Sequence, residues 1–389
     1  MRLLLFDTVL DGHHTDYLTH LITYWQAEKL PGKLFLVTPE GLAEELPAEQ
    51  ANSSNIEFVE ITSEELETAR NGSIVSRSFA GWNLYVKYAT QIRPDHALLM
   101  YFDLFQMGLW LGKKSPCPVS GIYFRPNFSQ IDGSSLKENL MVSGKKLLLN
   151  RALSNPAFSV VFCLDHSAIP AVQKIANRVK VRPLSDPVMQ FDLSTDQLEG
   201  QRKALGIKNS RKVFLLFGHL DDRKGIEPVL DAIEMMPSDN SRKLALVLAG
   251  PIDSEFRSII ESRIAASNAD AQIICQFQTF KGATIQSLFS VSDFVLTLYR
   301  KHVGMSSIVV RAALSQKPLI SSDFGYLGNL VESQHLGVTV DSESPSAICE
   351  AFCKALQGEI VFDQEAAKKL ADKNTARAFA KQILEGISE

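Results

Sequence analysis

Residues 293–328 read DFVLTLYRKHVGMSSIVVRAALSQKPLISSDFGYLG, which is a strand-length apolar run, a glycine-containing loop, a helical pattern and a second strand. The first run covers residues 294–298, and the loop after it contains Gly304. Ser306 and Ser307 open the helix, so free amides, hydroxyls and a positive helix end are expected together. Such an end suits a diphosphate, because unpaired N–H groups and the helix dipole both favour negative charge. The alternative is an ordinary strand–helix–strand unit in which the serines only cap the helix.

Apolar runs of strand length recur along the whole chain, with helical patterns between most of them. The first series lies at 3–6, 33–38, 56–61, 97–102, 119–124 and 159–164, and the second at 213–217, 244–249, 273–277, 294–298 and 318–321. Strands that are apolar almost throughout are covered on both faces. The sequence therefore predicts α/β domains with parallel sheets.

The pattern is interrupted at residues 181–187, VRPLSDP, where two prolines precede the second series. We therefore expect two Rossmann-like, doubly wound domains, residues 1–187 and 188–363, that face a central cleft. Residues 364–389 follow as a polar helical pattern. This C-terminal helix either stays with the second domain or crosses back to the first.

The composition is that of an ordinary globular protein of 389 residues, with 45% apolar and 22% charged side chains. A net charge of −4 gives no indication of nucleic-acid binding. Residues 77–182 are nevertheless basic, with 14 Lys or Arg against 5 Asp or Glu, so they either face an anionic partner or form a solvated surface. The five cysteines lack CxxC spacing, and we expect no metal site. The N-terminal apolar run is too short for a signal peptide, which predicts a cytoplasmic protein.

A glycine-containing turn follows the first predicted strand of the first domain. Gly12 in this turn lets a ligand approach the backbone closely. His13 or His14 either donates a hydrogen bond to a phosphate or sugar hydroxyl, or is simply solvated at the start of the next helix.

A second such turn, FGHLDDRKG at residues 217–225, follows the first predicted strand of the second domain. It places Gly218, His219 and Lys224 at the mouth of a helix, where cationic side chains and free amides favour an anion. The spacing of a P-loop is absent. The alternative is a surface turn with a capping aspartate.

Taken in order, these motifs resemble those of the retaining nucleotide-sugar glycosyltransferases of the GT-B fold, the family-four-like or group 1 glycosyl transferases. Where this family has Gly-Arg and then Lys-Gly, the chain has residues 218–219 and 224–225. Residues 249–251 stand where the family has Ala-Gly-x-Gly, and residues 304–307 where it has Gly-Phe-Gly-Leu. Residues 311–325 are similar to the family's Glu-Ala-Met-Ala segment and the x-Gly-x-Pro-Val-Ile-x-Ser-Asp that follows it. The resemblance covers nearly the whole chain.

The resemblance implies a hexosyltransferase-like enzyme of cell-surface polysaccharide or glycolipid biosynthesis. Such an enzyme transfers a sugar from a nucleotide-diphosphate sugar to a saccharide or lipid-linked acceptor with retention of configuration. The implied donor-binding residues are Gly12, His13, Gly218, His219, Lys224, Gly304, Ser306, Ser307 and Arg311. Because fixed cations would stabilise the leaving diphosphate, no metal or other cofactor is expected.

The chain departs from the family pattern at four functional positions, the first of which is His219, where the family has its phosphate-binding arginine. The two glutamates of the family fall on Val303 and Arg311, and its catalytic histidine falls on Arg125. Arg125, Lys224 and Asp103 are then the candidate catalytic residues, and Asp103 is either an acid/base and acceptor-positioning group or a helix N-cap. These departures leave two alternatives to glycosyl transfer. One is a catalytically inactive GT-B-like binding or regulatory subunit, and the other is a GT-B sugar-nucleotide epimerase.

A basic helical segment lies on the acceptor side of the expected cleft. Residues 135–151 combine Lys137, Lys145, Lys146 and Arg151 with several leucines. The segment either rests on an anionic membrane, which would suit a lipid-linked acceptor and place the protein peripherally at the membrane, or packs on the core with a basic outer face.

Overall fold

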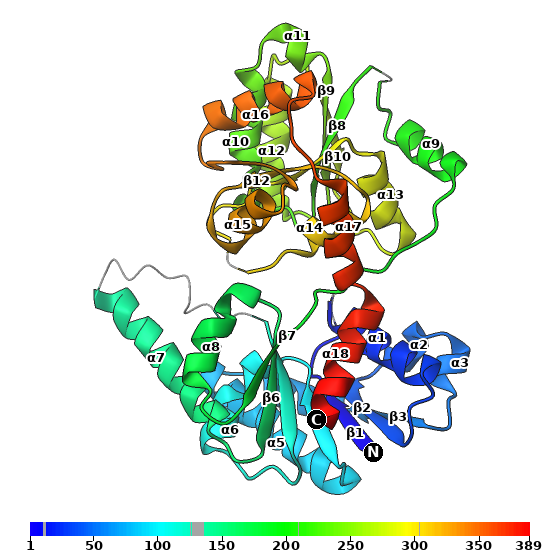
Figure 1. Cartoon of the computed structure of the whole chain (residues 1–389), viewed down its shortest axis with the longest axis vertical. Coiled ribbons are helices and arrows are strands. Elements are labelled where there is room, and N and C mark those ends of the chain that lie inside the picture. Colours follow the sequence, from blue (N-terminus) through cyan, green and yellow to red (C-terminus); the bar gives the residue numbers. More distant parts are fainter. Residues whose placement is uncertain (11–12, 125, 127–135, 209, 303) are drawn as a thin grey trace. The chain divides into compact units, whose positions relative to one another are not determined.

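The computed structural model describes residues 1–10, 13–124, 126, 136–208, 210–302 and 304–389. It contains two compact units. The first unit comprises Met1–Pro187 together with Ala376–Glu389, and the second comprises Val188–Thr375. Each unit is built around its own parallel sheet (Figure 1).

The sheet of the first unit has seven strands in the order β3-β2-β1-β4-β5-β6-β7, and all its pairs are parallel. The strands are β1 (Arg2–Phe6), β2 (Lys33–Pro39), β3 (Ile56–Ile61), β4 (His96–Leu99), β5 (Val119–Tyr123), β6 (Phe158–Cys163) and β7 (Lys180–Pro183). Strand order reverses at β1, where Phe6 lies between Val37 of β2 and Leu99 of β4. Ligands of doubly wound sheets bind at the carboxyl ends of the strands at such a reversal.

Helices cover both faces of this sheet. They are α1 (His13–Ala27), α2 (Leu42–Glu45), α3 (Ala48–Ala51), α4 (Ser63–Arg70), α5 (Ile74–Ile92), α6 (Gln106–Leu111), α7 (Leu136–Leu153), α8 (Ile169–Ile175) and α18 (Ala376–Ser388), with the short turns η1 (Phe102–Phe105) and η2 (His166–Ala168). Side chains of a strand alternate between the faces, so Leu4 and Phe6 enter one core while Leu3 and Leu5 enter the other.

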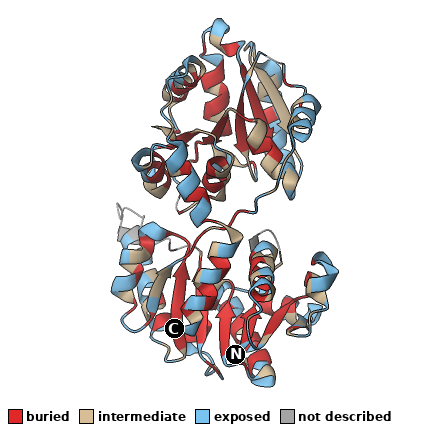
Figure 2. Ribbon diagram, turned by 45° about the vertical axis from the view of Figure 1, so that its right-hand side comes forward, coloured by how far each residue is buried: buried red, intermediate tan, exposed pale blue. Residues whose placement is uncertain are grey.

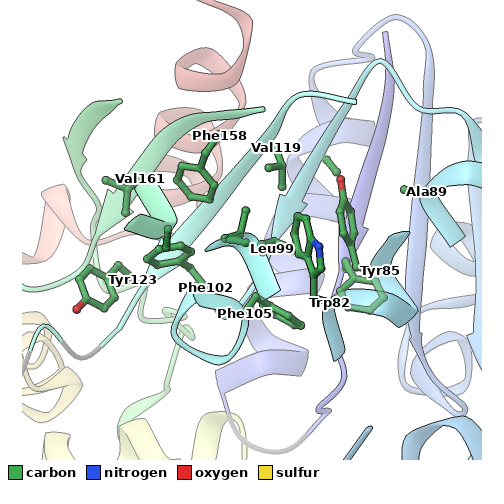
Figure 3. Close-up of a cluster of buried hydrophobic side chains, with 14 of the residues drawn as sticks. Trp82, Tyr85, Ala89, Leu99, Phe102, Phe105, Val119, Tyr123, Phe158 and Val161 are labelled. Carbon is green, nitrogen blue, oxygen red and sulfur yellow. The ribbon is translucent and has the colours of Figure 1, made fainter. Parts of the chain in front are cut away.

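Aromatic residues fill the first of these two cores. Trp82 and Tyr85 of α5 and Phe102 and Phe105 of η1 are almost completely buried against the sheet (Figure 3). The opposite core is closed by α1 and α18. Phe379 of α18 packs against Tyr17 of α1 with ring centroids 4.6 Å apart and the ring planes tilted by 45°. The last helix of the chain is therefore part of the first unit.

The sheet of the second unit has six parallel strands in the order β10-β9-β8-β11-β12-β13. They are β8 (Lys212–Phe217), β9 (Leu244–Ala249), β10 (Gln272–Gln276), β11 (Phe294–Thr297), β12 (Leu319–Ser322) and β13 (Gly337–Val340). Around them lie α9 (Thr195–Ala204), η3 (Asp222–Lys224), α10 (Ile226–Glu234), α11 (Ser238–Ser241), α12 (Ser254–Ala266), α13 (Ala283–Val291), α14 (Ser307–Leu314), α15 (Gly325–Ser333), α16 (Pro345–Gln357) and α17 (Gln364–Lys373). Strand order reverses between β8 and β11. Burial is concentrated on the strands of both sheets (Figure 2).

The prediction of two α/β domains with parallel sheets is confirmed, but three predicted elements differ. The fourth strand ends at Leu99, and the rest of the apolar run at 97–102 forms a turn at residues 100–101 and the start of η1 at Phe102. The expected interruption at 181–187 overlaps β7, which is an edge strand. Lys180 and Arg182 interrupt the run of apolar residues by which the other strands were predicted. Residues 364–389 form two helices, α17 and α18, rather than one.

The chain passes between the units twice, at residues 187–188 and 375–376. Val188 N–H donates to the Asn374 carbonyl over 3.0 Å, and Val188 pairs in parallel with Thr375. The two passages are therefore joined by backbone hydrogen bonding at their second-unit ends.

Glu65 at the start of α4 gives the first unit a dependence of stability on pH. Burial opposes ionisation, but hydrogen bonds from Lys87, Tyr88 and Thr62 lower the pKa of Glu65 from 4.5 to about 2. A carboxylate with a lowered folded-state pKa stabilises the fold above its unfolded pKa, and this contribution is lost as the pH falls through the folded value.

We expect Glu65→Gln to reduce the free energy of unfolding by about 1 kcal/mol at neutral pH, because glutamine keeps the capping box with Thr62 but loses the charge. The loss should shrink as the pH falls from 4.5 towards 2. Urea unfolding of variant and wild type across this range measures it. A loss that does not change with pH would show that the charge contributes nothing.

Candidate functional site

The reversal of strand order in the second unit brings two distant turns together. Residues 218–225 follow β8, and residues 298–306 follow the neighbouring strand β11. Both turns lie at the carboxyl ends of their strands, where doubly wound sheets bind ligands. The site predicted from residues 217–225 and 293–328 is thus a single edge of one sheet.

Two glycines allow the backbone to come close at this edge. Gly218 has a φ of 114°, and a Cβ there would lie 3.0 Å from Lys224 Nζ. Gly250, which follows β9, has a φ of 145°, and its Cβ would lie 1.8 Å from the carbonyl oxygen of Gly218. A side chain at either position would be strained by the positive φ and would also press on the turn that holds Lys224.

Lys224 is half-buried, and its ammonium group connects the two turns. Its Nζ donates to the Phe217 carbonyl oxygen over 3.1 Å and to the Tyr299 hydroxyl over 3.0 Å. The same atom lies 4.2 Å from the centroid of the Tyr299 ring. Tyr299 is only 4% exposed, and its hydroxyl lies 3.4 Å from Ser306 Oγ. Lys224 is thereby fixed beside the start of α14.

The charges around this turn are not equivalent. Arg223 binds the Asp221 carboxylate over 2.7 Å, and Arg300 pairs with Asp222, so both guanidinium groups have acidic partners. Within the described part of the second unit, Lys224 forms no ion pair, and its partners are a carbonyl and a phenol. Lys224 is therefore the cation of the turn that can act on a bound anion.

The start of α14 completes the arrangement. Gly304 has a φ of 99° and precedes Ser306, whose side chain caps the helix by accepting from the Ile308 N–H over 3.3 Å. The serine cap weighed in the sequence is therefore present, and the same hydroxyl also contacts Tyr299. Ser307 is half-buried in the first turn. A cation and a positive helix end stand side by side, which is an arrangement suited to a phosphate group.

The remaining predicted donor residues of this unit are less closely associated. His219 is 51% exposed, and its Nε2 lies 3.9 Å from Asp253 Oδ2. Arg311 lies one turn beyond Ser307 on the same face of α14 and already has an interaction partner within the chain. Val303 lies outside the described residues.

Tyr299 is a functional candidate that the sequence reading missed. Tyr299 directly follows the apolar run 294–298, and nothing in its spacing distinguishes it from a core aromatic residue. The signal that could have found it is positional. A polar group directly after a strand next to the reversal of strand order lies at the ligand edge.

The corresponding edge of the first unit holds a buried acid and a histidine. Asp7 follows β1 and is 1% exposed, and its Oδ2 lies 2.7 Å from Nδ1 of His14 in the first turn of α1. Burial raises the pKa of the Asp7 carboxyl, and the hydrogen bond from His14 opposes the rise. The sequence analysis weighed both His13 and His14 but listed only His13 among the implied donor-binding residues, whereas the histidine that the structure pairs with Asp7 is His14.

Asp103 has a defined contact at the same edge. It lies in η1 after β4, and its Oδ2 accepts the Phe124 N–H over 3.0 Å. Asp103 thus ties the end of β4 to the end of β5, and its role as acid/base or acceptor-positioning group stays a prediction. Gly12 and Arg125 lie outside the described residues, and only the backbone of His13 is described.

The described residues offer neither a cluster of metal ligands nor a membrane-spanning helix. They contain no group of three or more His, Cys, Asp or Glu side chains that could hold a metal ion. None of the helices within the described ranges is long and apolar enough to span a membrane.

The sequence that forms this edge is similar to a known protein family. Residues 198–377 match the model described as Glycosyl transferases group 1. These residues belong to that family. The matched range covers nearly the whole second unit, so the Lys224 turn and α14 lie inside a group 1 glycosyl transferase domain. The family resemblance stated from the sequence motifs is confirmed.

One curated relative and several solved structures are similar to the chain. The Bacillus subtilis (strain 168) protein assigned to teichuronic acid biosynthesis as the glycosyltransferase TuaC is 24% identical over 197 residues, which are 50% of this chain and 46% of that protein. The chain thus matches about half of the length of the TuaC protein.

The solved structures share the fold of the entire chain. Anabaena Alr3699/HepE in complex with UDP has a TM-score of 0.71 at 15% identity, with 100% of both chains covered. Sucrose-phosphate synthase (tll1590) from Thermosynechococcus elongatus has a TM-score of 0.73 at 14% identity, covering 99% of this chain and 98% of that one. WaaG, a glycosyltransferase of lipopolysaccharide biosynthesis, has a TM-score of 0.66 at 13% identity, with 99% of both covered. The chain as a whole therefore has the GT-B fold that the motifs predicted, and the group 1 glycosyl transferase domain is its second unit.

Proposed function

We propose that the protein is a glycosyltransferase that moves a sugar from a nucleotide-diphosphate sugar to a saccharide or lipid-linked acceptor. The observation that carries this proposal is Lys224, a cation held by neutral groups beside the start of α14. The HepE structures similar to this chain contain UDP, UDP and glucose, or UDP-glucose, which supports a nucleotide sugar as donor. The name of the TuaC relative supports an acceptor in polysaccharide biosynthesis.

In this proposal the acceptor hydroxyl bonds to the anomeric carbon as the bond from that carbon to the diphosphate oxygen breaks. The hydroxyl proton passes to the leaving phosphate, and attack on the face that the diphosphate leaves retains the configuration. Negative charge grows on the diphosphate in the transition state, so a fixed cation there lowers the barrier. Lys224 and the first turn of α14 supply this stabilisation, and we expect activity to persist in EDTA.

A nucleotide-sugar screen tests the proposal. Wild-type protein is heated with UDP-, GDP- and ADP-sugars, and the true donor at about 100 times its Kd should stabilise by about 2.7 kcal/mol. This corresponds to a rise in Tm of roughly 5–10 °C for a unit of this size. Donor turnover is then followed with and without acceptor saccharides. No stabilisation by any nucleotide sugar would refute the proposal.

The same experiment separates the two alternative functions. A binding or regulatory subunit would be stabilised by a nucleotide sugar without consuming it. An epimerase would convert the donor to its stereoisomer without releasing free nucleotide, which proton NMR of the donor detects. Release of nucleotide diphosphate together with a glycosylated acceptor is expected only of a transferase.

We also propose that the basic segment of the first unit contacts an anionic membrane. On α7, Leu140 is 76% exposed, and Met141, Leu147 and Lys146 are exposed as well. Leu149, Ala152 and Leu153 of α7 lie in the core and Val142 packs against it, so the core-packing alternative accounts for one side of the described part of the helix. Its neighbour in the fold is α6 (Figure 1). This helix exposes the apolar side chains of Trp110 and Leu111 and is followed by the exposed Lys113 and Lys114. Apolar side chains among cationic ones are typical of surfaces that rest in a lipid interface.

Vesicle flotation tests this contact. The wild type should float with phosphatidylglycerol-containing vesicles but not with pure phosphatidylcholine vesicles. The double variant Lys145→Glu/Lys146→Glu should lose this binding, since each basic residue contributes about 1 kcal/mol near an anionic surface. Lys368→Glu/Lys369→Glu makes the same charge change on α17 and should float like the wild type. Equal loss in both variants would mean that only net charge matters.

A further inference from the structure

The Asp7–His14 pair is the feature of the first unit that donor binding leaves unexplained. Asp7 is held from two sides, because Val9 N–H donates to Oδ1 over 3.0 Å while Oδ2 contacts His14 Nδ1. With Nδ1 engaged, the other ring nitrogen of His14, Nε2, is directed away from the carboxylate. Among the described residues, none forms a hydrogen bond with His14 Nε2. The His14 side chain is 14% exposed, so a ligand can reach it.

Aromatic rings fix the orientation of the His14 imidazole. The Tyr101 ring meets it edge-on with centroids 5.3 Å apart, and the Phe124 ring lies nearly parallel to it at 6.1 Å. Tyr101 follows β4 and Phe124 follows β5, so these rings line the same carboxyl edge as Asp7. The imidazole is therefore set in an aromatic surface at the ligand edge of the sheet.

Two other histidines of this unit show what a purely structural histidine looks like here. His20 and His96 are buried, and burial lowers the pKa of each to about 4, so both are neutral. His96 uses its Nε2 on Ser120 Oγ at 2.9 Å. His14 differs because a buried carboxylate orients its ring and one ring nitrogen is left for a ligand.

We propose that the Asp7–His14 pair binds a hydroxyl group of a neutral acceptor saccharide through His14 Nε2, with Asp7 as the positioning residue. A hydroxyl both donates and accepts, so it matches Nε2 in either tautomer of the ring. The neighbouring Asp7 carboxylate disfavours an anionic ligand at this place, while Tyr101 and Phe124 offer apolar contact to the C–H groups of a sugar ring. This inference rests on the proposed transferase function and extends it to the acceptor.

A pair of substitutions separates this role from a structural one. His14→Asn places an amide where Nδ1 stands, so it keeps a bond to Asp7 but does not reach the ligand. His14→Gln places an amide where Nε2 stands, so it loses the bond to Asp7 but reaches the ligand. If His14 only stabilises the fold, His14→Gln should be the more damaged variant. If it binds the acceptor, His14→Asn should be.

The assay uses UDP-glucose as donor and a panel of p-nitrophenyl glycosides as acceptors, with donor hydrolysis measured separately. We expect His14→Asn to raise the acceptor KM about tenfold, with donor KM and donor hydrolysis unchanged, and His14→Gln to recover part of the loss. The inference would be overturned if neither substitution affected transfer, or if donor and acceptor KM changed equally. Either result would leave the proposed transferase function intact. Donor hydrolysis without transfer to any glycoside would do the same. Failure of the wild type to bind or turn over UDP-glucose or another nucleotide sugar would overturn both.

Discussion

Lys224→Ala is expected to lower kcat/KM for the nucleotide-sugar donor by about 10²–10³-fold, the usual cost of removing one fixed group that stabilises transition-state charge. Lys224 bridges Phe217 and Tyr299 and has no acidic partner among the described residues, so its full charge faces the ligand edge. Affinity for the free nucleoside diphosphate should fall as well. Steady-state kinetics and titration calorimetry with UDP, or the diphosphate found by screening, measure the two effects.

Arg223→Ala is the matched control for this prediction. Arg223 is the adjacent residue of the same turn, but its guanidinium is 67% exposed and bound to Asp221. Its removal should change kcat/KM by less than about threefold, since exposed ion pairs contribute little. Comparable losses in Arg223→Ala and Lys224→Ala would mean that the turn acts through its overall charge or its folding, and the assignment of Lys224 would be wrong.

Gly250→Ala is expected to destabilise the second unit by more than about 3 kcal/mol, because its Cβ would meet the Gly218 carbonyl oxygen at 1.8 Å and its φ is 145°. Both groups in this contact are backbone, so no side chain can rotate away. The Tm of the second unit should fall by roughly 10 °C, or the protein should fail to accumulate in soluble form. Differential scanning calorimetry measures the change.

Gly200→Ala provides the comparison within the same unit. Gly200 lies exposed in α9, and a Cβ there would meet nothing within 4 Å. Alanine has the higher helix propensity, so this variant should be unchanged or more stable by up to about 1 kcal/mol. A Gly250→Ala protein with wild-type Tm would contradict this prediction, because it would show that the backbone at Gly250 can move away from Gly218 without loss of stability.

The sheets could be predicted from the sequence because their strands are apolar almost throughout. Phe294 to Thr297 is an example, since every residue of β11 is buried. The strand β7 escaped prediction because its lysine and arginine alternate with apolar residues at a sheet edge. Local pattern thus identifies central strands better than edge strands.

The candidate site was predictable only in part. Gly218, Lys224, Gly304 and Ser306 follow strands in recognisable motifs, and the structure brings their two turns to one edge. The contact between Lys224 and Tyr299 depends on the pairing of β8 with β11, which join residues about 80 positions apart. Sequence spacing carries no information on such a contact. The contact between His14 and Asp7 likewise depends on the fold, because it joins the end of β1 to the first turn of α1.

The helix α18 has a consequence for the order in which the protein can fold during synthesis. Domains that emerge first from the ribosome generally fold first. Here the first unit lacks part of its core, including Phe379 and Ile383, until α18 has been translated. The second unit is continuous from Val188 to Thr375 and is complete earlier. The unit that is begun first is therefore expected to be finished last, and until then the apolar groove that α18 fills is open to chaperones.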